Sequence, residues 1–277
     1  MENFKDWIGR SVTRIDTLTQ RLFDKYSATM SPFLFEAGER IAPPGLHFGL
    51  APPTPETDET GPDGAELKGV FLPPIPQPRR MWAGGSIETL RPLRHGALVI
   101  RTSTIADIQL KQGSNGSMFF VSISHDIADG DGTAIRERQD LVFSDPPAQG
   151  AAPVGPVQKI AAEWQVEASP LLLFRFSAFT FNGHRIHYDR SYVTQQEGYP
   201  GLVVHGPLIA TLLVDLLRRN TNQSLKKFEF KAVRPSFECA DGRAIHLSAQ
   251  SKDNKHVSLW AQDHEAYLTM QATAELN

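Results

Sequence analysis

Two stretches of the chain repeat one pattern, and this repeat limits the possible folds more than any other feature. Residues 90–143 contain three runs in which apolar and polar residues alternate, with glycine-containing turns between them. Residues 226–276 show the same alternation, which is typical of strands that bury one face. Arg91 and Arg234, each followed by proline, occupy matching places 143 residues apart, about half of the 277-residue chain. The sequence therefore predicts two related antiparallel units.

Each strand series is preceded by a segment with helical spacing of its apolar residues. In residues 16–30 the spacing predicts a helix capped by Asp16 or Thr17. Residues 207–220 carry a broad apolar stripe, with proline at the start and two arginines at the end. One long helix against a curved antiparallel sheet, present in each half, is an α+β architecture.

A proline-rich stretch near the middle of the chain separates the two units. Residues 144–156 read SDPPAQGAAPVGP and have almost no charge and no periodicity, as is typical of a linker. We therefore predict an N-terminal domain over 1–143, a linker over 144–157 and a C-terminal domain over 158–277.

Composition excludes several classes of protein. The net charge of −3 and the pI of about 6.3 argue against nucleic acid as a partner. No apolar run approaches the roughly 18 residues of a membrane span, and the acidic N-terminus does not resemble a secretory signal. A single cysteine, Cys239, excludes an intrachain disulfide and a cysteine-based metal cluster. We expect a cytoplasmic protein with no metal and no membrane partner.

The most concentrated polar segment spans residues 179–189 and reads FTFNGHRIHYD. It follows an apolar run over 171–181 that predicts a strand, and Asp189 is placed to cap a short helix over 190–197. The segment is therefore expected on a loop between a strand and a helix, where site residues often lie. A second concentrated segment ends at His205-Gly206, directly before the long helix, whose free N–H groups suit a developing oxyanion.

These segments resemble the MaoC-like, (R)-specific enoyl-thioester hydratase family. That family carries Asp-x-Asn-Pro-x-His-x-Asp, then Gly-Phe/Tyr, then His-Gly. Here Asn182 stands at the position of the catalytic Asp, His184 and Arg185 replace the Asn and Pro, and His187 matches the catalytic His. Gly206 matches the glycine whose backbone N–H is the oxyanion donor in that family.

The resemblance is stronger to one branch, the type 2 hydroxyacyl-thioester dehydratases with the mesaconyl-C4-CoA and itaconyl-CoA hydratases. It reads Phe-Asn-x-His-x-Ile-His-Tyr-Asp, as here, and residues 69–76 and 78–85 resemble its non-catalytic, FAS1-like N-terminal domain. The resemblance implies a double hot-dog fold with a catalytic C-terminal half. It also implies a hydro-lyase that hydrates a branched C5 dicarboxyl-CoA, mesaconyl-C4-CoA or itaconyl-CoA, to citramalyl-CoA.

Hydration of an α,β-unsaturated thioester needs a base for water and donors for the thioester oxygen. A neutral His187 can take the proton of the water near pH 7, and the N–H of Gly206 can meet the thioester oxygen. Asn182 cannot act as a carboxylate base, although it can orient water or substrate. Either His187 transfers the protons alone through one water, or an acid such as His184 or Asp189 helps. Coenzyme A enters only as part of the substrate, and no other cofactor is expected.

Several further side chains are candidates for contacts with the acyl group or with coenzyme A. Arg185 is a candidate for a substrate carboxylate or a phosphate, with a solvated arginine as the alternative. Arg79 and Arg80 could reach the phosphates of coenzyme A or simply begin a strand. Residues 136–140, RERQD, are expected on a solvated strand face. The expected binding residues are His184, Arg185, Tyr188, His205, Arg79, Arg80 and Trp82.

Two other functions stay open. A hot-dog thioesterase would release free coenzyme A thiol, although position 182 offers no acidic side chain for it. A non-catalytic module that binds acyl-CoA or an acyl carrier protein is the second alternative, and Asn182 is the feature that favours it. An acyl-CoA is the expected substrate, with an acyl carrier protein as the alternative carrier and a homodimer as the candidate assembly.

Overall fold

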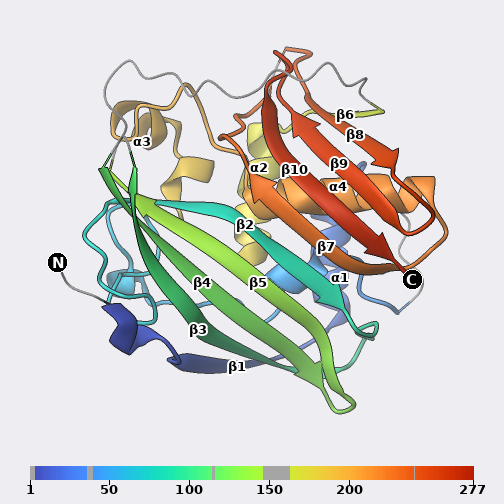
Figure 1. Ribbon diagram of the computed structural model, residues 1–277, viewed down its shortest axis with the longest axis horizontal. Helices are drawn as coiled ribbons and strands as arrows, with labels where there is room; N and C mark the ends of the chain where they lie inside the picture. The colour runs from blue at the N-terminus through green and yellow to red at the C-terminus, as the bar shows by residue number, and fades with distance from the viewer. Residues whose placement is uncertain (1–3, 36–39, 114–115, 146–162, 240) are drawn as a thin grey trace.

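The computed structural model describes residues 4–35, 40–113, 116–145, 163–239 and 241–277, and within them all strands form one antiparallel sheet (Figure 1). The order across the sheet is β1-β3-β4-β5-β2-β7-β10-β9-β8-β6. The strands are β1 Ser11–Thr17, β2 Arg79–Thr89, β3 Leu98–Gly113, β4 Gly116–Asp129, β5 Gly132–Ser144, β6 Trp164–Val166, β7 Leu225–Ala232, β8 Ile245–Ser251, β9 His256–Gln262 and β10 Leu268–Leu276. The α-helices are α1 Gln20–Met30, α2 Pro170–Thr180, α3 Arg190–Gln195 and α4 Gly206–Asn220, and the 3₁₀ turns are η1 Phe4–Trp7, η2 Leu46–Gly49, η3 Thr57–Glu59 and η4 Arg185–His187.

The sheet is built from two halves with the same strand order. β2 pairs with β7 at the centre, and outward from this junction the halves run β2-β5-β4-β3-β1 and β7-β10-β9-β8-β6. The repeated arginines also correspond, because Arg91 bonds Asp129 at the end of β4 and Arg234 lies 3.5 Å from Asp263 just after β9. The predicted α+β double hot-dog fold is therefore confirmed.

Two glycines of the motif over 78–85 allow the central strands to meet. A Cβ atom on Gly84 would stand 2.7 Å from the carbonyl oxygen of Phe230 on β7, and one on Gly85 would overlap the carbonyl oxygen of Arg138 on β5. Both glycines lie where β2 is hydrogen-bonded on both sides. Larger side chains there would push the two halves of the sheet apart.

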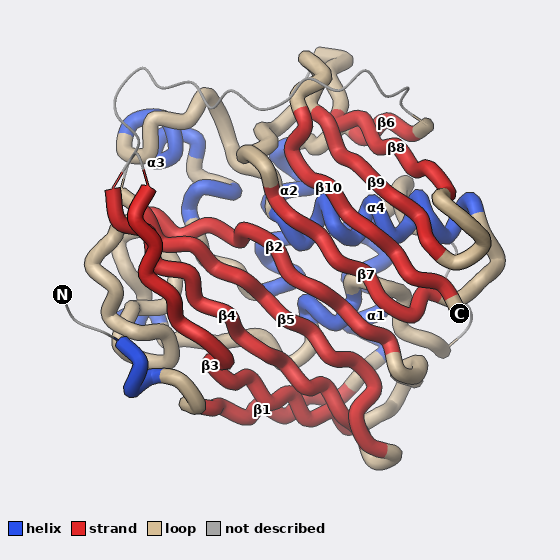
Figure 2. Tube along the Cα trace, viewed as in Figure 1, coloured by secondary structure: helices blue, strands red, loops and turns tan. Residues whose placement is uncertain are grey.

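Helix α4 is the central helix that the apolar stripe predicts, and its residues 208–217 are all buried. It packs against β7, β8 and β9. Figure 2 shows α1, α2 and α4 gathered on one face of the sheet, behind the central and C-terminal strands. The described residues of the N-terminal half have no helix of comparable length at the matching place, because only the short turns η2 and η3 lie between α1 and β2.

The first helix differs from its prediction in cap and position. Residues Ser11–Thr17 pair with β3 as an edge strand, so the N-cap is Thr19 and not Asp16 or Thr17. The side chain of Thr19 accepts a hydrogen bond from the N–H of Leu22. Helix α1 then packs mainly against α2, and it is not wrapped by the sheet as α4 is.

The predicted strand over 171–181 is wrong, because these residues form α2. Ser169 caps the helix through the N–H of Leu172, and Pro170 occupies the first turn. The apolar residues surround the helix, so periodicity could not separate it from a buried strand. The short helix predicted after Asp189 is confirmed as α3, with that aspartate as its N-cap.

The expectation of a solvated face for residues 136–140 is also wrong. In β5 the side chains of Arg136 and Arg138 point to solvent, but Glu137 is only 2% exposed. Alternation along the strand turns every second side chain inward. Residues 146–157 of the predicted linker lie outside the described residues. No helix in the described part of the chain is long and apolar enough to cross a membrane.

Candidate active site between the two halves

One cavity of about 1600 Å³ lies between residues of both halves of the molecule. Nine of the ten site residues that the sequence predicts line it. These nine residues are Arg79, Arg80, Trp82, Asn182, His184, His187, Tyr188, His205 and Gly206. The tenth, Arg185, does not line the cavity.

Two hydrogen bonds to Val203 hold His187 and its turn in place. It ends the turn η4, and the N–H of Val203 donates to the carbonyl of Ile186 at 2.9 Å. The carbonyl of Val203 accepts from Nδ1 of His187 at 2.7 Å. A carbonyl can only accept, so Nδ1 carries the proton of the neutral ring and Nε2 is the basic nitrogen.

Burial keeps His187 neutral. Loss of water around the ring lowers the pKa of His187 to about 4, against the opposing hydrogen bond to Val203 and with help from the nearby charge of Arg80. His205 stacks on it, with ring centroids 3.7 Å apart. Burial likewise holds the pKa of His205 well below its usual value. At neutral pH His187 is therefore ready to accept a proton.

His205 and Ser177 form the support behind this imidazole. Nε2 of His205 lies 2.8 Å from Oγ of Ser177 on α2, while its buried Nδ1 has no hydrogen-bond partner in the structure. The helix that the sequence did not predict thus orients the second ring of the stack.

Asn182 and His184 form the loop that enters the cavity ahead of His187. Oδ1 of Asn182 accepts from the N–H of His184 at 3.1 Å, a local turn that an aspartate could also make. The ring of His184 stands edge-on to that of His187, with centroids 5.7 Å apart. Burial, followed by the neighbouring His187, holds the pKa of His184 well below its usual value.

Gly206 begins α4 at the cavity. The first N–H groups of a helix have no partner within it, and the positive end of the helix dipole adds to their pull on an anion. A Cβ atom on Gly206 would lie 2.5 Å from Cε3 of Trp82. The indole of Trp82 therefore rests directly on the helix start, and glycine is the residue that fits there.

The predicted coenzyme A arginines lie side by side at the start of β2. Arg79 is an ion-pair partner of Glu197, with Nε 3.3 Å from Oε2, and its guanidinium lies over the ring of Tyr199. Burial lowers the pKa of Arg80, against the opposing charges of Asp63 and Glu66. Tyr188 is 41% exposed and donates from its hydroxyl to the carbonyl of Gly183 at 2.8 Å.

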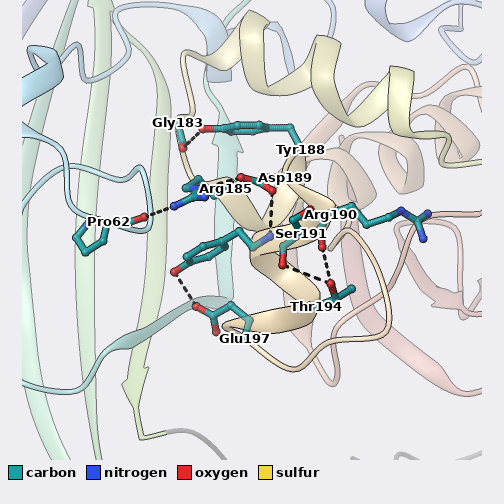
Figure 3. Close-up of polar contacts among 10 residues, drawn as sticks. Pro62, Gly183, Arg185, Tyr188, Asp189, Arg190, Ser191, Thr194 and Glu197 are labelled. Carbon is teal, nitrogen blue, oxygen red and sulfur yellow. Dashed lines mark hydrogen bonds and ion pairs between the residues drawn. The ribbon is translucent and has the colours of Figure 1, made fainter.

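Arg185 does not line the cavity, and its guanidinium is engaged by protein groups, so its binding of a substrate carboxylate or a phosphate stays a prediction from the sequence. Its Nη2 lies 2.8 Å from Oδ2 of Asp189, and its Nη1 donates to the carbonyl of Pro62 at 3.0 Å (Figure 3). The guanidinium also lies over the ring of Tyr192. Arg185 thus joins the active-site loop to a loop of the N-terminal half.

That N-terminal loop is a part of the site that sequence reasoning missed. The carbonyl of Asp63 accepts from the N–H of Arg185 at 2.8 Å, and its carboxylate Oδ2 lies 3.9 Å from Nε2 of His184. A Cβ atom on Gly64 would overlap the carbonyl of Gly183. The nearby sequence GPDG is a turn signal, but nothing in the pattern indicates which loop the turn meets.

A second missed group lies on the inner face of the N-terminal strands, where Arg101, Ser103, His125 and Gln139 line the same cavity. Their positions alternate along β3, β4 and β5. Polar residues at positions that otherwise predict burial are the available signal for this group. Within the described residues, no group of three or more His, Cys, Asp or Glu side chains is arranged to hold a metal ion.

Comparisons with known proteins agree with this architecture. A family profile for hydroxyacyl-thioester dehydratase type 2 matches residues 45–238. A mesaconyl-C(4)-CoA hydratase of Chloroflexus aurantiacus is 38% identical over 277 residues, covering 98% of this chain and 96% of the relative. A mitochondrial hydroxyacyl-thioester dehydratase type 2 of Schizosaccharomyces pombe is 38% identical over 77 residues, 27% of this chain and 26% of the relative.

Solved structures give the same fold at low sequence identity. A MaoC-like dehydratase of Phytophthora capsici superposes with a TM-score of 0.71 at 15% identity, covering 100% of this chain and 99% of that chain. A double-hotdog protein of Mycobacterium tuberculosis superposes with a TM-score of 0.56 at 14% identity, covering 98% and 96%.

The fold and the histidine-lined cavity between its halves define a double hot-dog protein of the MaoC-like hydratase class. The chain belongs to the type 2 hydroxyacyl-thioester dehydratase family. It is an enzyme, a hydro-lyase of the enoyl-CoA hydratase type.

Proposed function

We propose that this enzyme reversibly hydrates a branched C5 dicarboxyl-CoA, mesaconyl-C4-CoA or itaconyl-CoA, to citramalyl-CoA. The observation that carries the chemistry is the buried, neutral His187, whose Nδ1 is held by Val203 at 2.7 Å in the same cavity as the start of α4. The relative from Chloroflexus aurantiacus, a mesaconyl-C(4)-CoA hydratase by name, supports the choice of acyl group.

With mesaconyl-C4-CoA, whose double bond is conjugated to the thioester, Nε2 of His187 takes a proton from water as the oxygen adds to C3. The electron pair of the double bond moves toward the thioester oxygen, where the N–H of Gly206 stabilises the enolate. The protonated imidazole then returns its proton to C2 through one water, so that one molecule of water is added in total. Asn182 orients the water or the thioester, with its Oδ1 already occupied by the N–H of His184.

The two helper acids considered from the sequence fit this scheme unequally. Asp189 does not line the cavity, and its carboxylate accepts from the N–H of Tyr192 and from Arg185, contacts that lower the pKa of Asp189. It serves as a helix cap. His184 lines the cavity and is buried and neutral, so it is the remaining candidate for a second proton carrier.

The test is loss of the enoyl-thioester absorbance on crotonyl-CoA and mesaconyl-C4-CoA, and formation of citramalyl-CoA from itaconyl-CoA. We expect hydration of a dicarboxyl substrate with the highest kcat/KM, and a loss of about 10²–10⁴-fold in His187→Ala. His264→Ala, at an exposed position, is the matched control. Full activity in His187→Ala would contradict the mechanism. Release of free coenzyme A thiol without hydration would instead identify a thioesterase.

The proposal includes no cofactor besides the coenzyme A of the substrate, so dialysis against a chelator should leave the rate unchanged. A cytoplasmic location, a homodimer and the domain boundaries stay predictions from the sequence.

A further inference from the structure

A cluster of buried polar side chains lies on the inner face of the N-terminal half. Ser103 on β3 is opposite His125 on β4, and His125 is opposite Glu137 on β5. Arg101 and Gln139 each lie two residues from a member of this row, so they face the same side of the sheet. Four of the five side chains are less than 7% exposed, and Gln139 is partly buried. This half is the one that the family resemblance marks as non-catalytic.

The charges inside this cluster are only loosely satisfied. Nη2 of Arg101 lies 3.7 Å from Oε2 of Glu137, and Nε2 of His47 lies 3.8 Å from the same oxygen, both beyond hydrogen-bond distance. Among the described residues, the guanidinium of Arg101 has no hydrogen-bond acceptor. A guanidinium has five N–H donors, and Arg101 lines the cavity. An acceptor on a ligand in the cavity can therefore meet these donors.

The members of the cluster lie at different depths from the cavity. Arg101, Ser103, His125 and Gln139 line the cavity, whereas Glu137 does not. The amide of Gln139 donates to Oε1 of Glu137 at 2.7 Å. Oγ of Ser103 lies 2.7 Å from Nδ1 of His125. The part of the cluster that a ligand would meet thus offers a cation and neutral donors, with the carboxylate behind them.

The cluster and the catalytic groups are within reach of one acyl chain. Trp82 rests on Gly206, and three residues further along β2, Gly85 pairs with Gln139. Three residues of strand span about 10 Å. Arg101 stands on β3, but its guanidinium extends toward β5, where Nη2 lies 3.7 Å from Oε2 of Glu137.

We propose that Arg101, with Ser103, His125 and Gln139, binds the free carboxylate of a dicarboxyl acyl group whose thioester lies at Gly206. This inference rests on the proposed function and names the residues that select its substrate. A guanidinium binds a carboxylate through two parallel hydrogen bonds, which supplies the missing acceptors. Arg101 is only 6% exposed, and this burial favours a small carboxylate over a nucleotide phosphate. In this inference the N-terminal half binds and selects the acyl chain, and the C-terminal half hydrates it.

The experiment compares Arg101→Met with wild type on mesaconyl-C4-CoA and crotonyl-CoA, which lacks the second carboxylate. We expect kcat/KM to fall about 100-fold more on mesaconyl-C4-CoA than on crotonyl-CoA. Arg138→Met, directly before Gln139 but on the solvent side of β5 and half exposed, is the matched control and should lower the two alike. An equal loss on both substrates in Arg101→Met overturns the inference.

One further variant and one further substrate keep the result decisive. Loss of Arg101 leaves Glu137 buried without its cation, so the double variant Arg101→Met with Glu137→Gln removes both charges and should show the same selective loss while folded. Crotonyl-pantetheine carries no phosphate. If Arg101→Met lowers activity on crotonyl-CoA but not on crotonyl-pantetheine, Arg101 binds a phosphate and the carboxylate assignment is wrong.

Binding separates this inference from the proposed function. Calorimetric titration of the wild type and of Arg101→Met with both CoA thioesters requires no turnover. Tighter binding of mesaconyl-C4-CoA that Arg101→Met abolishes would support the carboxylate site even if hydration of every substrate failed. Equal affinity of the two proteins for mesaconyl-C4-CoA would exclude it.

Discussion

At the scale of single residues, the site depends on imidazoles that burial keeps neutral. His187 and His205 stack at 3.7 Å, and two positive charges at that separation would repel strongly in a buried environment. The stack therefore works only while both rings are uncharged. At low pH, protonation of His187 removes the base, and a positive charge on either ring disturbs the packing of the stack.

The pH dependence of catalysis follows from this state. A base acts in its neutral form, which predominates above its pKa, so kcat/KM should rise through about pH 4, the pKa to which burial lowers His187. It should then stay level to neutral pH. An unperturbed histidine would instead give the rising limb of the plot of kcat/KM against pH near pH 6.5. Asn182→Asp adds a carboxylate that favours the protonated ring, and it should move the limb upward by roughly one unit or more. Asn182→Ala is the uncharged control, and a limb that stays in place in Asn182→Asp would refute this coupling.

At the scale of elements, the strands could be predicted from the sequence. The distant segments that each loop contacts could not be predicted. Alternation located β4, β5 and β7 through β10, and the apolar stripe located α4 to within one residue. Helix α2 was missed because a fully apolar run fits a buried strand equally well. In the candidate site, residues 182–187 and His205-Gly206 could be found as motifs. The contacts of Arg185 could not be predicted, because its partner Pro62 lies 123 residues away on the other half.

Gly206→Ala tests the junction between β2 and α4. The added methyl group would lie 2.5 Å from Trp82, so either the indole or the first turn of the helix must move. Displacement of an oxyanion donor lowers kcat by about 10²-fold or more, and we expect that loss with an unchanged circular dichroism spectrum. Trp82→Leu makes room for the methyl group, so the substitution Gly206→Ala should cost much less in that background. An equal cost in both backgrounds would show that crowding against Trp82 is not the cause.

At the scale of the whole molecule, the two halves share one sheet and one cavity. The histidine motif of the cavity comes from the C-terminal half, and the N-terminal half supplies Trp82, the loop around Asp63 and the wall around Arg101. Directly before its central strand the C-terminal half has α4, whereas the described residues of the N-terminal half have only the short turns η2 and η3 between α1 and β2. A long buried helix at this place is therefore present in one half only, and α4, with residues 208–217 all buried, supplies it.

Arg185→Ala tests whether this connection between the halves acts on geometry or on substrate choice. The side chain is 38% exposed and bridges Asp189 and the carbonyl of Pro62, so its loss should lower stability by about 1 kcal/mol, or roughly 2–4 °C in Tm. Because it supports the loop of His187 and does not line the cavity, kcat/KM should fall by the same factor on crotonyl-CoA and mesaconyl-C4-CoA. Arg190→Ala, which removes a 63% exposed neighbour, is the control. A loss confined to the dicarboxyl substrate would return Arg185 to the binding site and would place the carboxylate away from Arg101.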